Sequence, residues 1–347
     1  MNKISGKLKH IPLFIIYLLI ISCSKNSSTE PKVDMQKLAT AFSNAQQIGN
    51  LKSLVVVHND SILKESFYGT GGADVAHDVR SVTKCVTGIL IGIAIDKGFL
   101  RSVDQTVGEF IDTLAFNITP DKSAIKIRHL LTMTSGFEWD EMTSVTGYNN
   151  WILSDNQVQY LFDKPLIHKS GEYFTYNTAA LHLLSVIITK ATGMSTKAFA
   201  LKYLFEPMGI TEIEWQMDNQ GFNNGGAGLK ITPHDMVKIG RLILNRGVYN
   251  GKVIVSSNYL DKCGSPQITT NNTIPYGTDY GYCWWIGQNN KYLFANGYGG
   301  QFIVIVPSSK LVVIATNQWS GVGAQVANDQ WYKTLSLIMN EIIPVFE

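Results

Sequence analysis

The chain has 347 residues, of which 45% are hydrophobic and 16% are charged, and its 29 basic and 27 acidic side chains give a net charge of +2. An average soluble chain is about 25% charged. A low charged fraction combined with abundant apolar residues excludes a chain that is disordered throughout. The nearly balanced charge gives no indication of nucleic-acid binding, which needs clustered basic residues. The length allows one large domain or two ordinary ones with a sizeable core.

The first 22 residues have the organisation of an export signal. Three lysines precede an apolar run over residues 11–21, which is shorter than the ~20 residues that a bilayer requires but typical of the core of a secretory signal. The run ends at Cys23, after which the sequence turns polar. This pattern resembles a bacterial lipoprotein signal, and the alternative is an ordinary signal peptide or a short anchor. We expect cleavage before Cys23, lipidation of Cys23, a tether over residues 23–33, and a mature charge of −1 because three lysines are removed.

Hydrophobic patterning predicts the elements of the remaining chain, residues 34–347, which we interpret as a single catalytic domain. A helix is expected over 35–47, and two β-rich runs at 54–57 and 62–68 are separated by Asn59-Asp60, a typical hairpin turn. The later elements are expected to be strands at 280–286, 302–306 and 311–316, and a helix at 324–342. These patterns predict an α+β fold in which an antiparallel sheet, built from both chain ends, is flanked by helices and carries a helical inserted subdomain at roughly 100–250, with a cleft between the parts.

The segment that follows Arg80 contains the most informative charge in the sequence. Lys84 is the only charged residue between Ser81 and Ile95, and the segment is apolar nearly all round. Such a helix is buried, and burial lowers the pKa of a lysine, so that its amine can act as a base. Ser81 lies three residues earlier on the same helix face, an arrangement suited to covalent acyl transfer. The alternative is a helix-capping Ser81 beside a Lys84 that extends to solvent.

Two further segments contain candidate site residues. Tyr176 precedes a predicted helix at 179–192, where its hydroxyl could face the cleft and a neighbouring lysine would favour its phenolate form. The alternative is a tyrosine that only packs at the helix start. Residues 297–301 are rich in glycine and lead into a strand. Glycines allow another group to approach the backbone, and free N–H groups at such an edge stabilise an oxyanion, whereas the alternative is a plain β-turn.

Taken together, these segments resemble the serine β-lactamase and penicillin-binding-protein superfamily, and in particular the group near class C β-lactamases, 6-aminohexanoate-dimer hydrolases and esterases. The resemblance extends in order over roughly residues 50–340. It implies the β-lactamase/transpeptidase-like fold, Ser81 as the acylated nucleophile, Lys84 as its partner and Tyr176 as a proton shuttle, with no metal and no cofactor. Its matching segments are Ser81-Val82-Thr83-Lys84, 127–136, 174–176, 204–209, 225–229, 280–285 and 297–301.

The resemblance also implies an oxyanion hole and a set of substrate contacts. The oxyanion hole would use the backbone N–H of Ser81 and that of Gln301, with Gly300 as the next choice. The substrate-binding candidates are Thr178, Tyr298 and Gly299. Two departures from the family pattern matter, because Thr178 replaces an asparagine and the Gly/Tyr-rich segment replaces a Lys-Thr-Gly or His-Thr-Gly motif. Since that motif helps to hold the carboxylate of a β-lactam, we expect cleavage of esters or small amides and little lactam cleavage.

Several remaining residues are interpreted as structural. Residues 138–141 could face an amine substrate, but a solvated loop is the preferred interpretation. Asp235 is expected to cap a helix that starts after Thr232. No Cys or His spacing indicates a metal site, and free buried thiols are preferred over a Cys263–Cys283 disulfide.

The function expected from the sequence is that of a serine hydrolase anchored by Cys23 in the bacterial cell envelope, facing the periplasm or lying on the outer membrane. Its substrate would be a small ester, amide or peptide, and nucleic acid is not an expected partner. One alternative is a D-Ala-type peptidase or a true β-lactamase. A second alternative, from another class, is a non-catalytic envelope binding protein with the same fold, which the presence of Ser81, Lys84 and Tyr176 disfavours.

Overall fold

An antiparallel sheet of eight strands is assembled from both ends of the chain, in the order β2-β1-β13-β12-β11-β10-β9-β8. The computed structural model describes residues 1–2, 33–144 and 146–347, so that the predicted signal, the lipidation site at Cys23 and most of the tether lie outside the described residues. The strands are β1 (Leu51–His58), β2 (Ser61–Phe67), β3 (His77–Asp78), β4 (Glu214–Trp215), β5 (Leu229–Ile231), β6 (Val248–Tyr249), β7 (Lys252–Val253), β8 (Ile268–Ile274), β9 (Gly277–Tyr280), β10 (Trp285–Ile286), β11 (Leu293–Gly297), β12 (Gln301–Val306) and β13 (Leu311–Asn317). This arrangement confirms the predicted α+β fold with a sheet built from both termini.

Along the chain, most of the helices fall between the two groups of strands that form the eight-stranded sheet, β1–β2 and β8–β13. They are α1 (Met35–Ala45), α2 (Val82–Asp96), α3 (Pro120–Ser123), α4 (Ile127–Leu131), α5 (Thr146–Ile152), α6 (Gln157–Phe162), α7 (Thr178–Thr192), α8 (Thr196–Ala200), α9 (Pro233–Leu244), α10 (Ser257–Cys263) and α11 (Ala324–Leu337). None of the helices in the described ranges is long and apolar enough to span a bilayer.

The first hairpin and its neighbour β13 form one end of the sheet, with β2 as the edge strand. Asn59 and Asp60 both adopt positive φ, 49° and 63°, as a tight hairpin turn between twisted strands requires. The β-branched residues of β1 pair directly with those of β13, with Val55 opposite Ile314. Both of these residues are fully buried, because helices cover both faces of the sheet.

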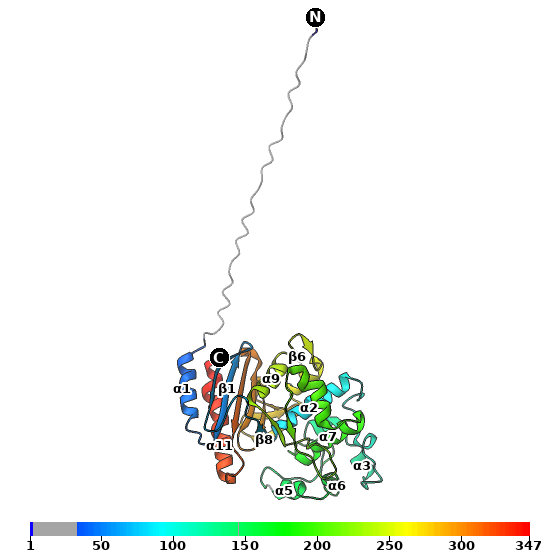
Figure 1. Ribbon diagram of the computed structural model, residues 1–347. Coiled ribbons are helices and arrows are strands. Elements are labelled where there is room, and N and C mark those ends of the chain that lie inside the picture. Colours follow the sequence, from blue (N-terminus) through cyan, green and yellow to red (C-terminus); the bar gives the residue numbers. More distant parts are fainter. Residues whose placement is uncertain (3–32, 145) are drawn as a thin grey trace. The chain divides into compact units, whose positions relative to one another are not determined.

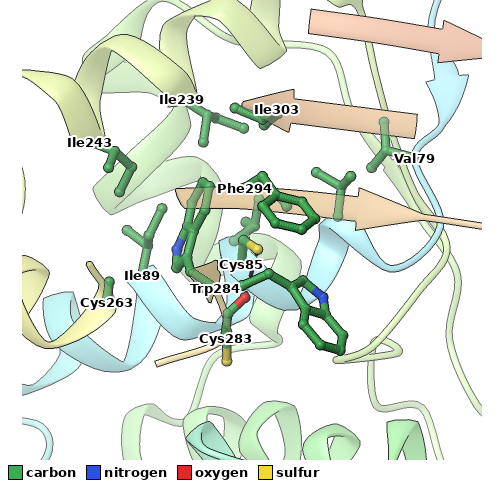
Figure 2. Packing of buried hydrophobic residues seen from close by; sticks show 14 of the residues in the cluster. Val79, Cys85, Ile89, Ile239, Ile243, Cys263, Cys283, Trp284, Phe294 and Ile303 are labelled. Atoms are coloured by element: carbon green, nitrogen blue, oxygen red, sulfur yellow. Dashed lines mark hydrogen bonds between the residues drawn. The ribbon is translucent and has the colours of Figure 1, made fainter. Parts of the chain in front are cut away.

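The helices form a layer on each face of the sheet (Figure 1). Helices α1 and α11, from the two ends of the chain, lie on one face, where Trp331 of α11 packs 5.9 Å from Phe302 of β12. Helices α9 and α2 lie on the other face. Figure 2 shows Ile239 of α9 beside Ile303 of β12, and Ile89 of α2 on the same side of the sheet. The apolar helix that contains Lys84 is therefore in the interior of the protein.

The prediction of one continuous strand over 280–286 is wrong, because the structure divides this segment between β9 and β10. Cys283 adopts a positive φ of 65° and donates its N–H to Leu131 O at 2.9 Å, while Gly281 donates to Trp284 O at 2.8 Å. This local turn uses hydrogen bonds that would otherwise join the ladder. It brings Trp285 opposite Tyr280 in the sheet, and Trp285 then packs against the candidate site. The last predicted helix, over 324–342, is confirmed, since α11 ends at Leu337 and a π-helical segment continues it to Ile342.

Candidate active site

Ser81 lies at the start of α2, immediately after a strained residue. Arg80 has a φ of 49°, which is uncommon for a side chain with a Cβ. Two contacts hold it there, because its N–H donates to Asp78 Oδ1 at 2.9 Å and its guanidinium lies 4.3 Å from the centre of the Trp319 ring. Ser81 takes the N-cap position of α2, yet its hydroxyl makes no capping hydrogen bond. The hydroxyl is therefore available to partners other than its own helix, and backbone strain of this kind is commonly found at functional sites.

Lys84 is buried beside Ser81 in the first turn of α2. Its side chain is 1% exposed, and its Nζ donates to Ser81 Oγ at 2.8 Å and to Gly226 O at 2.9 Å. Burial lowers the pKa of Lys84 from 10.5 to about 8, against an opposing effect from Glu141. These contacts confirm that Lys84 is buried rather than extended to solvent. A substantial fraction of neutral amine is present near pH 8, within hydrogen-bonding reach of a hydroxyl.

Tyr176 lies across the site from Lys84, just before α7. Its ring stacks on Trp285, with centroids 5.7 Å apart, and Lys84 Nζ lies 4.9 Å from the ring centre. Burial, followed by the charge of Glu141, raises the pKa of Tyr176 well above its usual value, and a hydrogen bond with Ser81 acts in the opposite direction. The expectation that Tyr176 is a phenolate is therefore wrong. Tyr176 is a neutral phenol that can donate a proton, and Lys84 is the better base.

Within residues 33–144 and 146–347, the backbone N–H of Ser81 and those of Tyr298 and Gly299 in the β11–β12 turn have no acceptor. The end of β11 lies close to the nucleophile, because a Cβ on Gly297 would be 2.4 Å from Val79 O and 3.1 Å from Arg80 Cβ. The Gly300 N–H is already donated to Gly297 O at 3.1 Å, so the expectation that it completes the oxyanion hole is wrong.

Gln301, the first choice for the second oxyanion donor, belongs to the sheet. Its side chain is fully buried and exchanges hydrogen bonds with the backbone of Asn317, and the residue pairs with Gly297 in the sheet. Of the two unpaired N–H groups in this turn, we favour that of Tyr298 as the partner of Ser81, because Tyr298 directly follows Gly297, the residue that approaches Arg80. The sequence missed Tyr298 N–H because the length of the β11–β12 turn, which decides which N–H is free, has no sequence signature of its own.

Comparison with known proteins places this chain in a family. The β-lactamase family model matches residues 35–335. The chain belongs to the β-lactamase family. A curated relative, the 6-aminohexanoate-dimer hydrolase of Paenarthrobacter ureafaciens, is 23% identical over 313 residues, which cover 84% of this chain and 79% of the relative.

Solved structures show the same fold at low sequence identity. EstCE1, described as a hydrolase with promiscuous acyltransferase activity, superposes with a TM-score of 0.70 at 16% identity. The match covers 87% of this chain and 100% of the EstCE1 chain. A penicillin-binding protein from Bacillus halodurans superposes with a TM-score of 0.65 at 18% identity, covering 83% and 97% of the two chains. These likenesses confirm the predicted β-lactamase/transpeptidase-like fold.

Within this β-lactamase-family site, the three substrate-binding candidates occupy different positions. Thr178 is 1% exposed, and its hydroxyl donates to Glu141 Oε1 at 2.5 Å, so that its polar atom is not free for a substrate. Tyr298 is half-buried at the β11–β12 turn and packs edge-on against Trp319, at 6.4 Å. Gly299 is buried in the same turn with a φ of 76°. Of the three, Tyr298 alone retains accessible surface, and it directly follows Gly297, which approaches Arg80.

Glu141 is the charged residue of the site that sequence reasoning missed. The structure places it against the N-terminal end of α7, where it accepts hydrogen bonds from Thr178 and Trp139. The interpretation of residues 138–141 as a solvated loop is therefore wrong for Glu141, although it holds for the exposed Glu138. No local pattern identifies this contact, because 37 residues separate Glu141 from Thr178.

The helix-capping role of Asp235 and the preference for free buried thiols are confirmed. Thr232 and Asp235 form a reciprocal capping box at the start of α9. The three cysteines of the described ranges are free and buried. Cys85 Sγ donates to Cys283 O at 2.8 Å, and Figure 2 shows Cys85, Cys283 and Trp284 close together. No cluster of three or more His, Cys, Asp or Glu side chains in residues 33–144 and 146–347 is arranged to hold a metal ion.

Proposed function

We propose that this β-lactamase-family protein is a serine hydrolase that cleaves esters or small amides through an acyl-enzyme on Ser81. The observation that supports the proposal most strongly is the 2.8 Å contact between Ser81 Oγ and the Nζ of a buried lysine whose pKa is about 8. A weakly acidic hydroxyl becomes a useful nucleophile only when a base of suitable pKa lies within hydrogen-bonding distance. The named functions of the 6-aminohexanoate-dimer hydrolase and EstCE1 are consistent with amide or ester substrates.

The proposed reaction has two stages. In the first, Ser81 Oγ forms a bond to the substrate carbonyl carbon while its proton passes to neutral Lys84, and the N–H groups of Ser81 and Tyr298 stabilise the oxyanion. The bond to the alcohol or amine then breaks, and the leaving group takes a proton from the phenol of Tyr176, which recovers it from Lys84. In the second stage a water molecule loses a proton to the same base and attacks the acyl carbon. The bond between the acyl carbon and Ser81 Oγ then breaks, the acid product leaves, and Ser81 Oγ takes the proton back from Lys84.

Labelling with a fluorophosphonate tests this proposal. We expect one covalent adduct per molecule of a form that starts at residue 24, located on Ser81 by peptide mass spectrometry, and turnover of a p-nitrophenyl ester. Ser81→Ala should abolish both the labelling and the turnover. Turnover that survives Ser81→Ala, or a folded wild-type protein that neither labels nor turns over ester, would contradict the mechanism. The same protein should hydrolyse a chromogenic cephalosporin far more slowly than the ester, because β11 carries no Lys or His at its end.

We also propose that the mature protein is held in the bacterial cell envelope by lipid attached to Cys23. The support is the sequence alone, in which a basic leader and an apolar run precede that cysteine. In bacteria fed an alkyne fatty acid, the full-length chain should acquire the label and sediment with membranes, whereas Cys23→Ser should do neither. Release of unlabelled wild-type protein into the soluble envelope fraction would favour an ordinary signal peptide instead.

A further inference from the structure

The carboxylate of Glu141 is held in a fixed position at the start of α7. Its Oε2 accepts hydrogen bonds from Thr178 N at 2.9 Å and from Trp139 Nε1 at 2.6 Å, and its Oε1 accepts from Thr178 Oγ1 at 2.5 Å. The N-terminal end of a helix also stabilises a negative charge. Three donors and the helix end together hold this group in one orientation, although the residue lies in a loop and is only partly buried.

Lys84 and Thr178, the residue that binds Glu141, both lie close to Gly226. A Cβ placed on Gly226 would lie 2.5 Å from Thr178 Cγ2 and 3.5 Å from Lys84 Nζ, so that Thr178 and the amine contact the same glycine. The charge of Glu141 raises the pKa of Lys84 in opposition to burial, and it raises the pKa of Tyr176. The carboxylate is therefore close enough to both reacting side chains to affect a substrate charge between them.

The other groups that face Lys84 do not balance this negative charge. Arg80 lowers the pKa of Lys84, but its guanidinium is itself paired with Asp78 at 3.7 Å. Cys85 and Cys283 are neutral thiols, because burial raises the pKa of each. Within residues 33–144 and 146–347, Glu141 makes no ion pair with a Lys, Arg or His side chain. When Lys84 is neutral and reactive, the site therefore carries an unbalanced negative charge.

We propose that Glu141 determines the charge selectivity of the site: it favours esters or amides with a quaternary or protonated amine near the scissile bond and disfavours those with a carboxylate there. The inference depends on the acyl-enzyme function proposed above. Its physical basis is that a fixed charge at the edge of a partly desolvated site acts at low effective dielectric, where a single charge at ~6 Å alters binding by a factor of ten or more. A substrate ammonium supplies the missing counter-charge, whereas a carboxylate adds repulsion.

The test compares matched neutral, cationic and anionic substrates on both sides of the scissile bond. The acyl series consists of the p-nitrophenyl esters of hexanoic acid, 6-(trimethylammonio)hexanoic acid and adipic acid. The leaving-group series consists of acetylthiocholine, its neutral 3,3-dimethylbutyl analogue and S-(2-carboxyethyl) thioacetate. In at least one series the cation-to-anion ratio of kcat/KM should fall on the order of tenfold in Glu141→Gln. In the wild type, the same ratio should decrease as salt is added, because salt screens exposed charges.

Two variants serve as controls for this experiment. Glu138→Gln removes the same charge three residues away, from an exposed position without side-chain hydrogen bonds, and should leave both ratios unchanged. Thr178→Val removes one donor to Glu141 and should move the ratio partway toward that of Glu141→Gln. A ratio that stays within about twofold of the wild type in both series, with Ser81 still labelled by fluorophosphonate, would overturn the inference but not the proposed function. If Glu141→Gln does not fold, a wild-type ratio independent of salt in both series would overturn it equally.

Discussion

Replacing Lys84 with Met should lower kcat/KM for a neutral ester by about 10²–10⁴-fold, the usual contribution of a general base, without destabilising the protein. Met is similar in length and is apolar, so it fills the space of a side chain that is 1% exposed. The loss of activity is expected because no other amine lies within hydrogen-bonding distance of Ser81 Oγ in the described residues. Ester hydrolysis by purified Lys84→Met, measured beside the wild type at pH 8, provides the comparison.

The stability of this variant follows from the sign of the pKa shift. The pKa of Lys84 is about 8 in the folded protein and 10.5 ordinarily, so the unfolded chain binds the proton more tightly. Wild-type stability therefore rises with pH between about 8 and 10.5, and below pH 8 the full cost of burying the ammonium is present. Removing that ammonium recovers at most about 3 kcal/mol, from which the unpaired Gly226 carbonyl subtracts about 1–3 kcal/mol.

Lys84→Met should consequently be as stable as the wild type, or slightly more stable, at pH 7 in urea unfolding. An inactive variant that is also destabilised by more than about 2 kcal/mol would instead indicate a structural role for the lysine. The wild-type pH profile gives an independent reading. Activity requires the neutral amine, so kcat/KM should rise through pH ~8 and fall about tenfold per pH unit well below it. A profile that is flat between pH 6 and 9 would contradict the assignment of Lys84 as the base.

Local patterns were sufficient to predict the elements that contain the reacting side chains. The solitary charge of Lys84 in an apolar helix, the turn at Asn59-Asp60 and the capping box of Asp235 each depend on residues within a few positions of one another. The structure confirms these features because short-range geometry determines them. The burial of Lys84 and the lowering of its pKa also follow from the composition of one helix.

The features that the sequence did not predict depend on contacts between distant segments. The break between β9 and β10 is stabilised by a hydrogen bond from Cys283 to Leu131, and Glu141 enters the site through Thr178. The predicted protonation state of Tyr176 was wrong for the same reason. Burial against Trp285 and the charge of Glu141 raise the pKa of the phenol and outweigh the nearby lysine. Periodicity contains no information about such pairings, whose partners are set by the packing of the whole fold.

Gly226 provides the most specific test of this packing, because its carbonyl fixes the position of Lys84. A Cβ at residue 226 would lie 2.5 Å from Thr178 Cγ2 and 3.2 Å from Thr178 O, closer than such atoms approach. In Gly226→Ala the loop must therefore move away from α7, and its carbonyl, now 2.9 Å from Lys84 Nζ, moves with it. Since a displacement of about 1 Å in a catalytic group costs on the order of 10²-fold, we expect kcat for a neutral ester to fall by about that factor.

A second substitution distinguishes this steric mechanism from a general loss of stability. Thr178→Ser removes the Cγ2 methyl that the new Cβ would meet and keeps the hydroxyl that donates to Glu141. The double variant Gly226→Ala/Thr178→Ser should therefore recover part of the activity lost in Gly226→Ala. Gly323→Ala is the matched control, because a Cβ there has nothing within 4 Å. If the double variant is no more active than Gly226→Ala while both remain folded, the methyl contact is not what positions the carbonyl, and the account of how Lys84 is held must change.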